Sequence, residues 1–124
     1  MDIIRQELLV KGDKGVKRLS VVFDSGATRS FVRNDVANEL CTPKKLLIPR
    51  EFIVADGNKI IREFFYDLAV EIEGREIGVK AFLVDNLSVP MIFGAPDLEV
   101  YRIRLDLARG RLDLSELIGS MYAL

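Results

Sequence analysis

The chain has 124 residues, of which 18 are basic and 19 acidic, so its net charge is −1. This length suits one domain, and we expect a single domain over residues 1–124. The balanced charge argues against nucleic acid and membrane surfaces as partners. No apolar run approaches the roughly 20 residues of a membrane span, and the charged opening segment is unlike a signal peptide. We therefore expect a cytoplasmic protein.

The sequence contains no histidine and a single cysteine, Cys41. This composition excludes Ser-His and Cys-His nucleophile pairs, histidine-ligated metals, a disulfide within the chain and a zinc site made of cysteines. We therefore expect no cofactor and no metal. The remaining chemistry rests on carboxylates, hydroxyls, lysine or the backbone, and Cys41 is expected to be a small buried residue.

The first third of the chain predicts strands and one helix. Residues 3–10 and 16–23 read as strands joined by a glycine turn, and the second strand becomes wholly apolar at its end, as a buried strand does. Residues 28–32 read as a further short extended piece. Residues 33–40 carry apolar side chains at helical spacing and predict a short helix, with Asn34 as its candidate N-cap.

The middle of the chain predicts three strands, at residues 46–55, 59–73 and 74–84. Asp56-Gly57 and Glu73-Gly74 separate these strands and predict hairpins; in the first pair, both residue types tolerate the positive φ angles of tight turns.

The last third predicts one more strand, a helix and a hairpin. The apolar strand ends at Gly94, and a short helix follows with Pro96 in its first turn. Residues 101–114 alternate and fold back around Gly110, with these apolar side chains on one face: Ile103, Leu105, Leu107, Leu112 and Leu114. Residues 115–124 read either as a helical turn or as an extended end.

Many short strands, glycine turns and one or two short helices predict an all-β, mostly antiparallel fold: a small closed or folded barrel. Function does not follow from such a fold alone.

Asp24 follows a buried strand and precedes the run Ser25-Gly26-Ala27-Thr28. An ionised carboxylate at such a place is costly to desolvate unless it is paired, hydrogen-bonded or protonated. The small residues let the backbone turn tightly and present amide hydrogens, while Ser25 and Thr28 supply hydroxyls. The same residues also suit an ordinary turn at a strand end.

Two carboxyl groups that share one proton can hydrolyse an amide without histidine or metal. The charged group takes a proton from water, and the protonated group gives one to the substrate carbonyl. Asp-Ser-Gly occurs once in the chain. A second such group would therefore come from a second copy of the chain, across a twofold axis.

Residues 23–32 (FDSGATRSFV) resemble the active-site loop of retropepsin-like aspartic proteases, and are especially similar to the Asp-Ser-Gly-Ala-Thr form of retrotransposon and related cellular members. Residues 52–60 (FIVADGNKI) look like the flap, the hairpin that closes over a bound peptide in this family. Residues 91–96 (MIFGAP) resemble the apolar-apolar-glycine segment beside the catalytic loop. The resemblance spans nearly the whole chain and implies an acid-protease barrel and a homodimeric endopeptidase that cleaves extended peptides or proteins.

The resemblance implies a role for each matched residue. Asp24 is expected to be the catalytic acid, one from each subunit. Active-site support and dimer contacts are expected from Ser25, which reaches the partner loop, from Thr28, which braces its own loop, and from Phe93 and Gly94. Substrate binding is expected from the following residues: Gly26, Ala27, Ala55, Asp56, Gly57 and Ile92.

Two other functions stay open on the residues alone. A peptide-binding or dimerisation module could keep this fold without turnover, because Ala95-Pro96 follows Gly94 where a bulky residue and then Asp are more usual in the family. A β-barrel domain with a chance loop at Asp24 is the other alternative.

Overall fold

The computed structural model describes residues 2–54 and 56–117. In this part of the chain the strands and helices follow in the order β1 (Ile3–Gly12), β2 (Gly15–Asp24), β3 (Ser30–Arg33), α1 (Asn34–Leu40), β4 (Lys44–Ile53), β5 (Lys59–Ile72), β6 (Arg75–Val84), β7 (Met91–Gly94), α2 (Ala95–Tyr101), β8 (Arg104–Asp106) and β9 (Arg111–Asp113). None of the described helices is long and apolar enough to cross a membrane.

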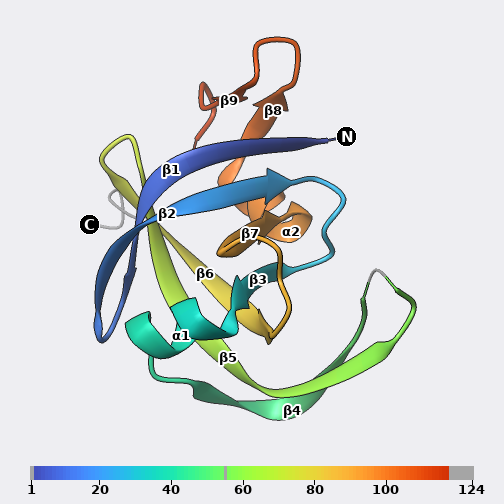
Figure 1. Ribbon diagram of the computed structural model, residues 1–124. Coiled ribbons are helices and arrows are strands. Elements are labelled where there is room, and N and C mark those ends of the chain that lie inside the picture. Colours follow the sequence, from blue (N-terminus) through green and yellow to red (C-terminus); the bar gives the residue numbers. More distant parts are fainter. Residues whose placement is uncertain (1, 55, 118–124) are drawn as a thin grey trace.

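Six strands close into a barrel in the order β1-β2-β7-β3-β6-β5, because β5 also pairs with β1. The β2–β7 and β3–β6 pairs are parallel, and the other pairs in the ring are antiparallel. β4 pairs with β5 outside the ring, and β8–β9 form a separate hairpin (Figure 1). The expected fold class, a mostly antiparallel closed barrel with short helices, is confirmed.

The barrel core is built from the inward side chains of these strands. Phe23 on β2 and Phe93 on β7 are fully buried, and their ring centroids lie 5.0 Å apart. Cys41 is buried as expected, and burial raises the pKa of its thiol. Cys41 therefore behaves as a small core residue and not as a thiolate.

The first helix forms where predicted, but its expected cap is wrong. α1 starts at Asn34, its N-cap residue is Arg33, and no side chain caps it. The Asn34 side chain instead accepts a hydrogen bond from Asn38 Nδ2 (2.9 Å), one turn further along the helix. Arg33 pairs with Asp35 in the first turn (Nε to Oδ1, 2.7 Å).

The predicted hairpins form with turns of different kinds. Glu73 and Gly74 both have positive φ (49° and 77°), as a tight two-residue turn between β5 and β6 requires. The β4–β5 turn is longer, since β4 ends at Ile53 and β5 begins at Lys59. Gly57 in that turn has a φ of 86°.

The last predicted hairpin is shorter than its sequence alternation suggests. β8 and β9 flank Gly110, but β8 ends at Asp106, so Leu107 is 49% exposed and does not join the apolar face. The predicted strand at residues 28–32 likewise begins only at Ser30. Most of the ambiguous tail, residues 118–124, lies outside the described residues.

Candidate active site

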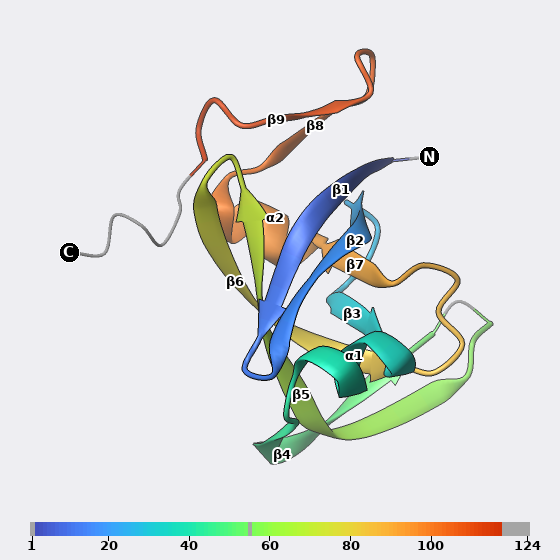
Figure 2. The ribbon, with the colours of Figure 1, turned by 60° about the vertical axis from the view of Figure 1, so that its left-hand side comes forward.

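Asp24 is the last residue of β2, and its backbone is paired on both sides. It lies opposite Ile3 on β1 and Gly94 on β7. Pairing on two sides holds the strand end in place, and the Asp24 side chain is half-buried there. The loop after β2 lies on the same side of the barrel as the tip of the β4–β5 hairpin (Figures 1 and 2).

The loop after Asp24 folds back toward its own carboxylate. The Gly26 N–H donates to Asp24 Oδ1 (2.8 Å), and the Ala27 N–H donates to the Asp24 carbonyl oxygen (3.2 Å). A Cβ at position 26 would lie 3.3 Å from Asp24 Oδ1, so glycine keeps this approach open. Among the described residues, no lysine or arginine pairs with Asp24. The carboxylate is therefore held by backbone and not neutralised by a cation.

A buried hydroxyl fastens this loop to the start of α2. Ser30 is 1% exposed, and its Oγ accepts a hydrogen bond from the Gly94 N–H (3.0 Å) and donates one to Asp97 Oδ2 (2.6 Å). The Ala95 N–H also donates to the Ala27 carbonyl oxygen (2.9 Å). A buried N–H without a partner is costly, so this hydroxyl stabilises the junction.

Glycine is required at position 94 because β7 packs directly against the backbone of the loop after Asp24 there. A Cβ at position 94 would lie 2.2 Å from the Arg29 carbonyl oxygen, a backbone atom that cannot move aside cheaply. The absence of a side chain thus lets β7 pass directly against the loop that carries Asp24.

The sequence did not point to Ser30 and Asp97, and the bracing role implied for Thr28 stays a prediction. Thr28 is exposed, whereas Ser30 and Val32 point inward from β3. The alternation of Ser30, Phe31 and Val32 is the signal that could have revealed a buried serine.

A cleft of about 500 Å³ opens at Asp24. Its lining comes from the loop after β2, from β3, from the end of β4, from the end of β6 with the segment after it, and from β7: Asp24, Gly26, Ala27, Thr28, Phe31, Ile53, Val54, Val84, Asn86, Leu87, Ser88 and Ile92. Asp24 is the charged member of this lining. The cleft therefore suits an uncharged, largely apolar ligand at the carboxylate.

The expected site residues fall into three places. Gly26, Ala27 and Ile92 line the cleft with Asp24. Phe93 and Gly94 are buried behind it and form its support. Ser25, Asp56 and Gly57 do not line the cleft.

The flap tip is held by its own side chains. Asp56 accepts hydrogen bonds from the Asn58 N–H (2.9 Å) and from Asn58 Nδ2 (2.9 Å). Asp56 and Gly57 do not belong to the cleft lining, whereas Val54 does. Ala55 lies outside the described residues.

The cleft lining also includes residues 86–88, Phe31 and Val84. No motif in the sequence pointed to these residues. Phe31 packs edge-on against Phe52 of β4, with ring centroids 5.8 Å apart. In the sequence, residues 86–88 look like an ordinary connection between two apolar strands. Their place in the cleft becomes evident only when β6 and β7 are both paired with β3.

Ser25 lines a second groove, which is distinct from the cleft at Asp24. Its N–H (3.2 Å) and its Oγ (3.3 Å) both donate to the Asp2 carbonyl oxygen. This groove, of about 550 Å³, is lined by Asp2, Ser25, Ala95, Leu98, Glu99, Arg102, Ile103, Arg104, Leu105 and Leu107. The segment from Asp24 to Thr28 thus contributes to two hollows, one at Asp24 and one at Ser25.

The described part of the chain contains no candidate metal-binding cluster. Among the described residues, no group of three or more His, Cys, Asp or Glu side chains is placed to hold a metal ion.

The comparisons with known proteins agree with this geometry. Residues 1–119 match the family described as retroviral aspartyl protease. No curated protein matches the chain. Among solved structures, it is similar to the retroviral protease-like domain of Ddi1 from Leishmania major, with a TM-score of 0.57 and 14% sequence identity over 94% of this chain and 89% of that chain. At this identity the likeness shows the fold, whereas the family match spans nearly the whole sequence. The chain therefore belongs to the retroviral aspartyl protease family.

Proposed function

We propose that this chain is a homodimeric aspartic endopeptidase that cleaves extended polypeptides, with Asp24 as the catalytic residue of each subunit. The observation that carries the proposal is the position of Asp24. Its carboxylate sits at a strand end paired on both sides, accepts a backbone N–H and opens into a cleft with apolar walls. Family membership supports the same reaction class. The Asp-Ser-Gly-Ala-Thr loop further suggests kinship with the retrotransposon and cellular branch.

In the proposed mechanism, two Asp24 carboxyl groups share one proton across a twofold axis. The charged group removes a proton from a water held between them, and the resulting hydroxide attacks the scissile carbonyl carbon while the protonated group donates its proton to the carbonyl oxygen. When the tetrahedral intermediate breaks its C–N bond, the protonated carboxyl group gives its proton to the leaving amine. The other carboxylate takes a proton from a hydroxyl of the intermediate, so a carboxylic acid is released and the shared proton is restored. Gly26, Ala27 and the flap would hold the peptide extended, with Ile92 under its side chains.

The groove at Ser25 is the surface we assign to the partner subunit. It adjoins the loop that carries Asp24, and Leu107 at its edge is 49% exposed. Glu99 and Arg102 give it both signs of charge, which suits a twofold contact in which each residue meets its complement on the other copy.

The activity test is cleavage of a mixed peptide library between about pH 3 and 7, the range in which carboxyl groups titrate. The parent chain is compared with Asp24→Asn, which keeps the size of the side chain and removes its acidity. Cleavage by the parent alone is expected. Equal cleavage by Asp24→Asn, or an inert parent that is folded and dimeric, would overturn the proposal, and peptide binding without cleavage would favour a binding module.

The dimer test is sedimentation of the parent, of Leu107→Asp and of Val16→Asp. Both leucine and valine here are about half exposed (49% and 55%), but Val16 lies on β2 away from the groove. Leu107→Asp should shift the protein toward monomer and lower activity, whereas Val16→Asp should not. A parent that is monomeric at working concentration contradicts the shared active site.

A further inference from the structure

The strand that leads to the flap departs from regular pairing in its middle. Lys45 is paired with Phe64, and Arg50 with Arg62. Four residues of β4, 46–49, thus lie between paired positions, against one residue, Glu63, on β5. Extra residues of this kind leave the plane of the sheet and redirect their side chains. Leu47 is accordingly 97% exposed and Ile48 70% exposed.

These residues form part of a surface hollow that we call the β4 patch: Lys45, Leu47, Ile48, Arg50, Phe65 and Lys80, around a volume of about 470 Å³. Its charged members are all cations. Lys80 Nζ lies 5.0 Å from the centroid of the Phe65 ring. The patch therefore combines uncovered apolar surface with positive charge.

The cations of the β4 patch are not neutralised within the described part of the chain. Lys45, Arg50 and Lys80 form no ion pair there. Two nearby carboxylates are already paired elsewhere, Glu51 with Lys59 and Asp67 with Lys44, each at 3.2 Å. Glu63 does not line the hollow. A ligand that brings carboxylates and apolar side chains together would satisfy both halves of the patch.

The position of β4 favours a polypeptide as that ligand. β4 is the last strand in the sheet order, so its outer edge carries backbone groups that no strand in the described part of the chain pairs. An extended peptide can bond such an edge, whereas a lipid surface or a nucleic acid offers no matching backbone. The net charge of −1 also gives no general attraction for polyanions.

We propose that the β4 patch binds an acidic, apolar segment of the polypeptide substrate outside the cleft; this inference rests on the proposed protease function. Arg50 in the patch and Ile53 in the cleft lining are three residues apart on one strand, a span of about 10 Å. Their side chains leave opposite faces of the strand, so a substrate that lies along the outer edge of β4 can reach both places. Binding at the patch raises the local concentration of the scissile segment, so it lowers KM and leaves kcat unchanged.

The test is direct binding, which needs no cleavage. The probe is a fluorescein-labelled peptide, Glu-Leu-Asp-Phe-Glu-Leu-Asp-Phe, titrated with the full chain carrying Asp24→Asn while anisotropy is recorded. Because each exposed ion pair contributes up to about 1 kcal/mol, the double variant Lys45→Glu with Lys80→Glu should bind about tenfold more weakly. The variant Leu47→Ser with Ile48→Ser should also bind the probe more weakly. Added salt should lower the affinity of the unmodified patch for the probe.

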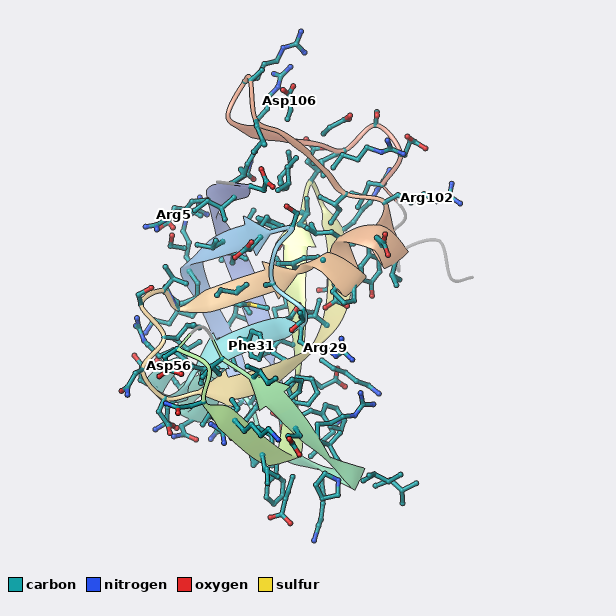
Figure 3. The ribbon with its side chains drawn as sticks, turned by 90° about the vertical axis from the view of Figure 1, so that its right-hand side faces the viewer. Arg5, Arg29, Phe31, Asp56, Arg102 and Asp106 are labelled. Carbon is teal, nitrogen blue, oxygen red and sulfur yellow. The ribbon has the colours of Figure 1, made fainter. Side chains whose placement is uncertain are left out.

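The matched control is Arg5→Glu with Arg18→Glu, two exposed residues of β1 and β2 that make the same change in net charge. In Figure 3, Arg5 lies in the upper half of the molecule, whereas strands β4 and β5 lie in the lower half. This control should bind the probe as the parent does. Absence of probe binding, equal loss in the control, or preferred binding to phosphatidylserine vesicles would overturn the inference. Since Asp24→Asn is inert by design, none of these outcomes depends on whether the parent cleaves peptides.

Discussion

Replacing Ser30 with alanine is the sharpest test of how the loop after Asp24 is held. The Ser30 hydroxyl accepts from the buried Gly94 N–H at 3.0 Å and donates to Asp97 at 2.6 Å. Alanine leaves that N–H without a partner, which costs about 1–3 kcal/mol. The Asp97 carboxylate loses a charged hydrogen bond but is half-buried, so water replaces part of it. We expect Ser30→Ala to lower the free energy of unfolding by about 3 kcal/mol in all.

Ser20→Ala is the matched control for this prediction. Ser20 lies on β2, and its hydroxyl is buried with no hydrogen-bond partner among the described residues. Removing this hydroxyl breaks no bond and relieves a desolvated polar group, so stability should stay within about 0.5 kcal/mol or rise. The two variants differ only in whether the lost oxygen was bonded.

The measurement is urea unfolding at one fixed protein concentration, because association would shift the apparent stability. With a slope of about 2 kcal/mol per M, Ser30→Ala should move the midpoint down by about 1.5 M. The same variant should cleave peptides more slowly, since the loop at Asp24 loses its anchor. Equal midpoints for Ser30→Ala and Ser20→Ala would refute the view that Ser30 fastens the loop.

Three further predictions follow from backbone and charge. Arg102 has a φ of 56°, a left-handed angle that glycine adopts without strain, so Arg102→Gly should raise stability by up to about 1 kcal/mol in thermal unfolding. Because Arg102 also lines the groove assigned to the partner, this is measured at a dilution at which the chain is monomeric; a drop would show that its side chain holds the fold. Gly57 has a φ of 86° with open space around it, so Gly57→Ala should strain the flap turn and lower kcat/KM while hardly changing the melting temperature; unchanged kinetics would contradict a role for this turn. The Thr42 N–H, bonded to Asp13 at 2.7 Å, lowers the pKa of that carboxyl below its usual 3.8. Asp13 therefore contributes stability above pH 3.8 that is lost as pH falls through its lower folded value, and the difference between the parent and Asp13→Asn should shrink on acidification in parallel urea titrations.

Features that depend on neighbours in the chain could be predicted from the sequence. The Glu73-Gly74 turn, the helix after Gly94 and the strand that ends at Asp24 all form as expected. Each rests on local physics: positive φ at a tight turn, proline in a first helical turn, and an apolar run that marks a buried strand. The Asn34 cap failed because the competing partner, Asn38, lies on the same helix face and takes up its side chain.

Contacts between segments that are distant in the chain could not be predicted from the sequence. Ser30 bonds to Gly94 and Asp97, which are 64 and 67 positions away, and no local pattern records which buried donor will lie opposite a serine. The bulge in β4 is similar, because the four residues that stand against one residue of β5 become visible only once β5 sets the register.

The sequence by itself determined that Asp24 lies at the end of a buried strand, in a loop that resembles the active-site loop of retropepsin-like proteases. Strand periodicity and small residues are local properties of the chain, so both features could be recognised without the structure. Only the tertiary structure decided what surrounds that acid. The cleft joins segments near residues 24–31, 53–54 and 84–92, and barrel closure brings these segments together. Burial of the shared core, and not any local preference, sets that closure, so the walls of the site and the buried serine that holds it emerged with the fold.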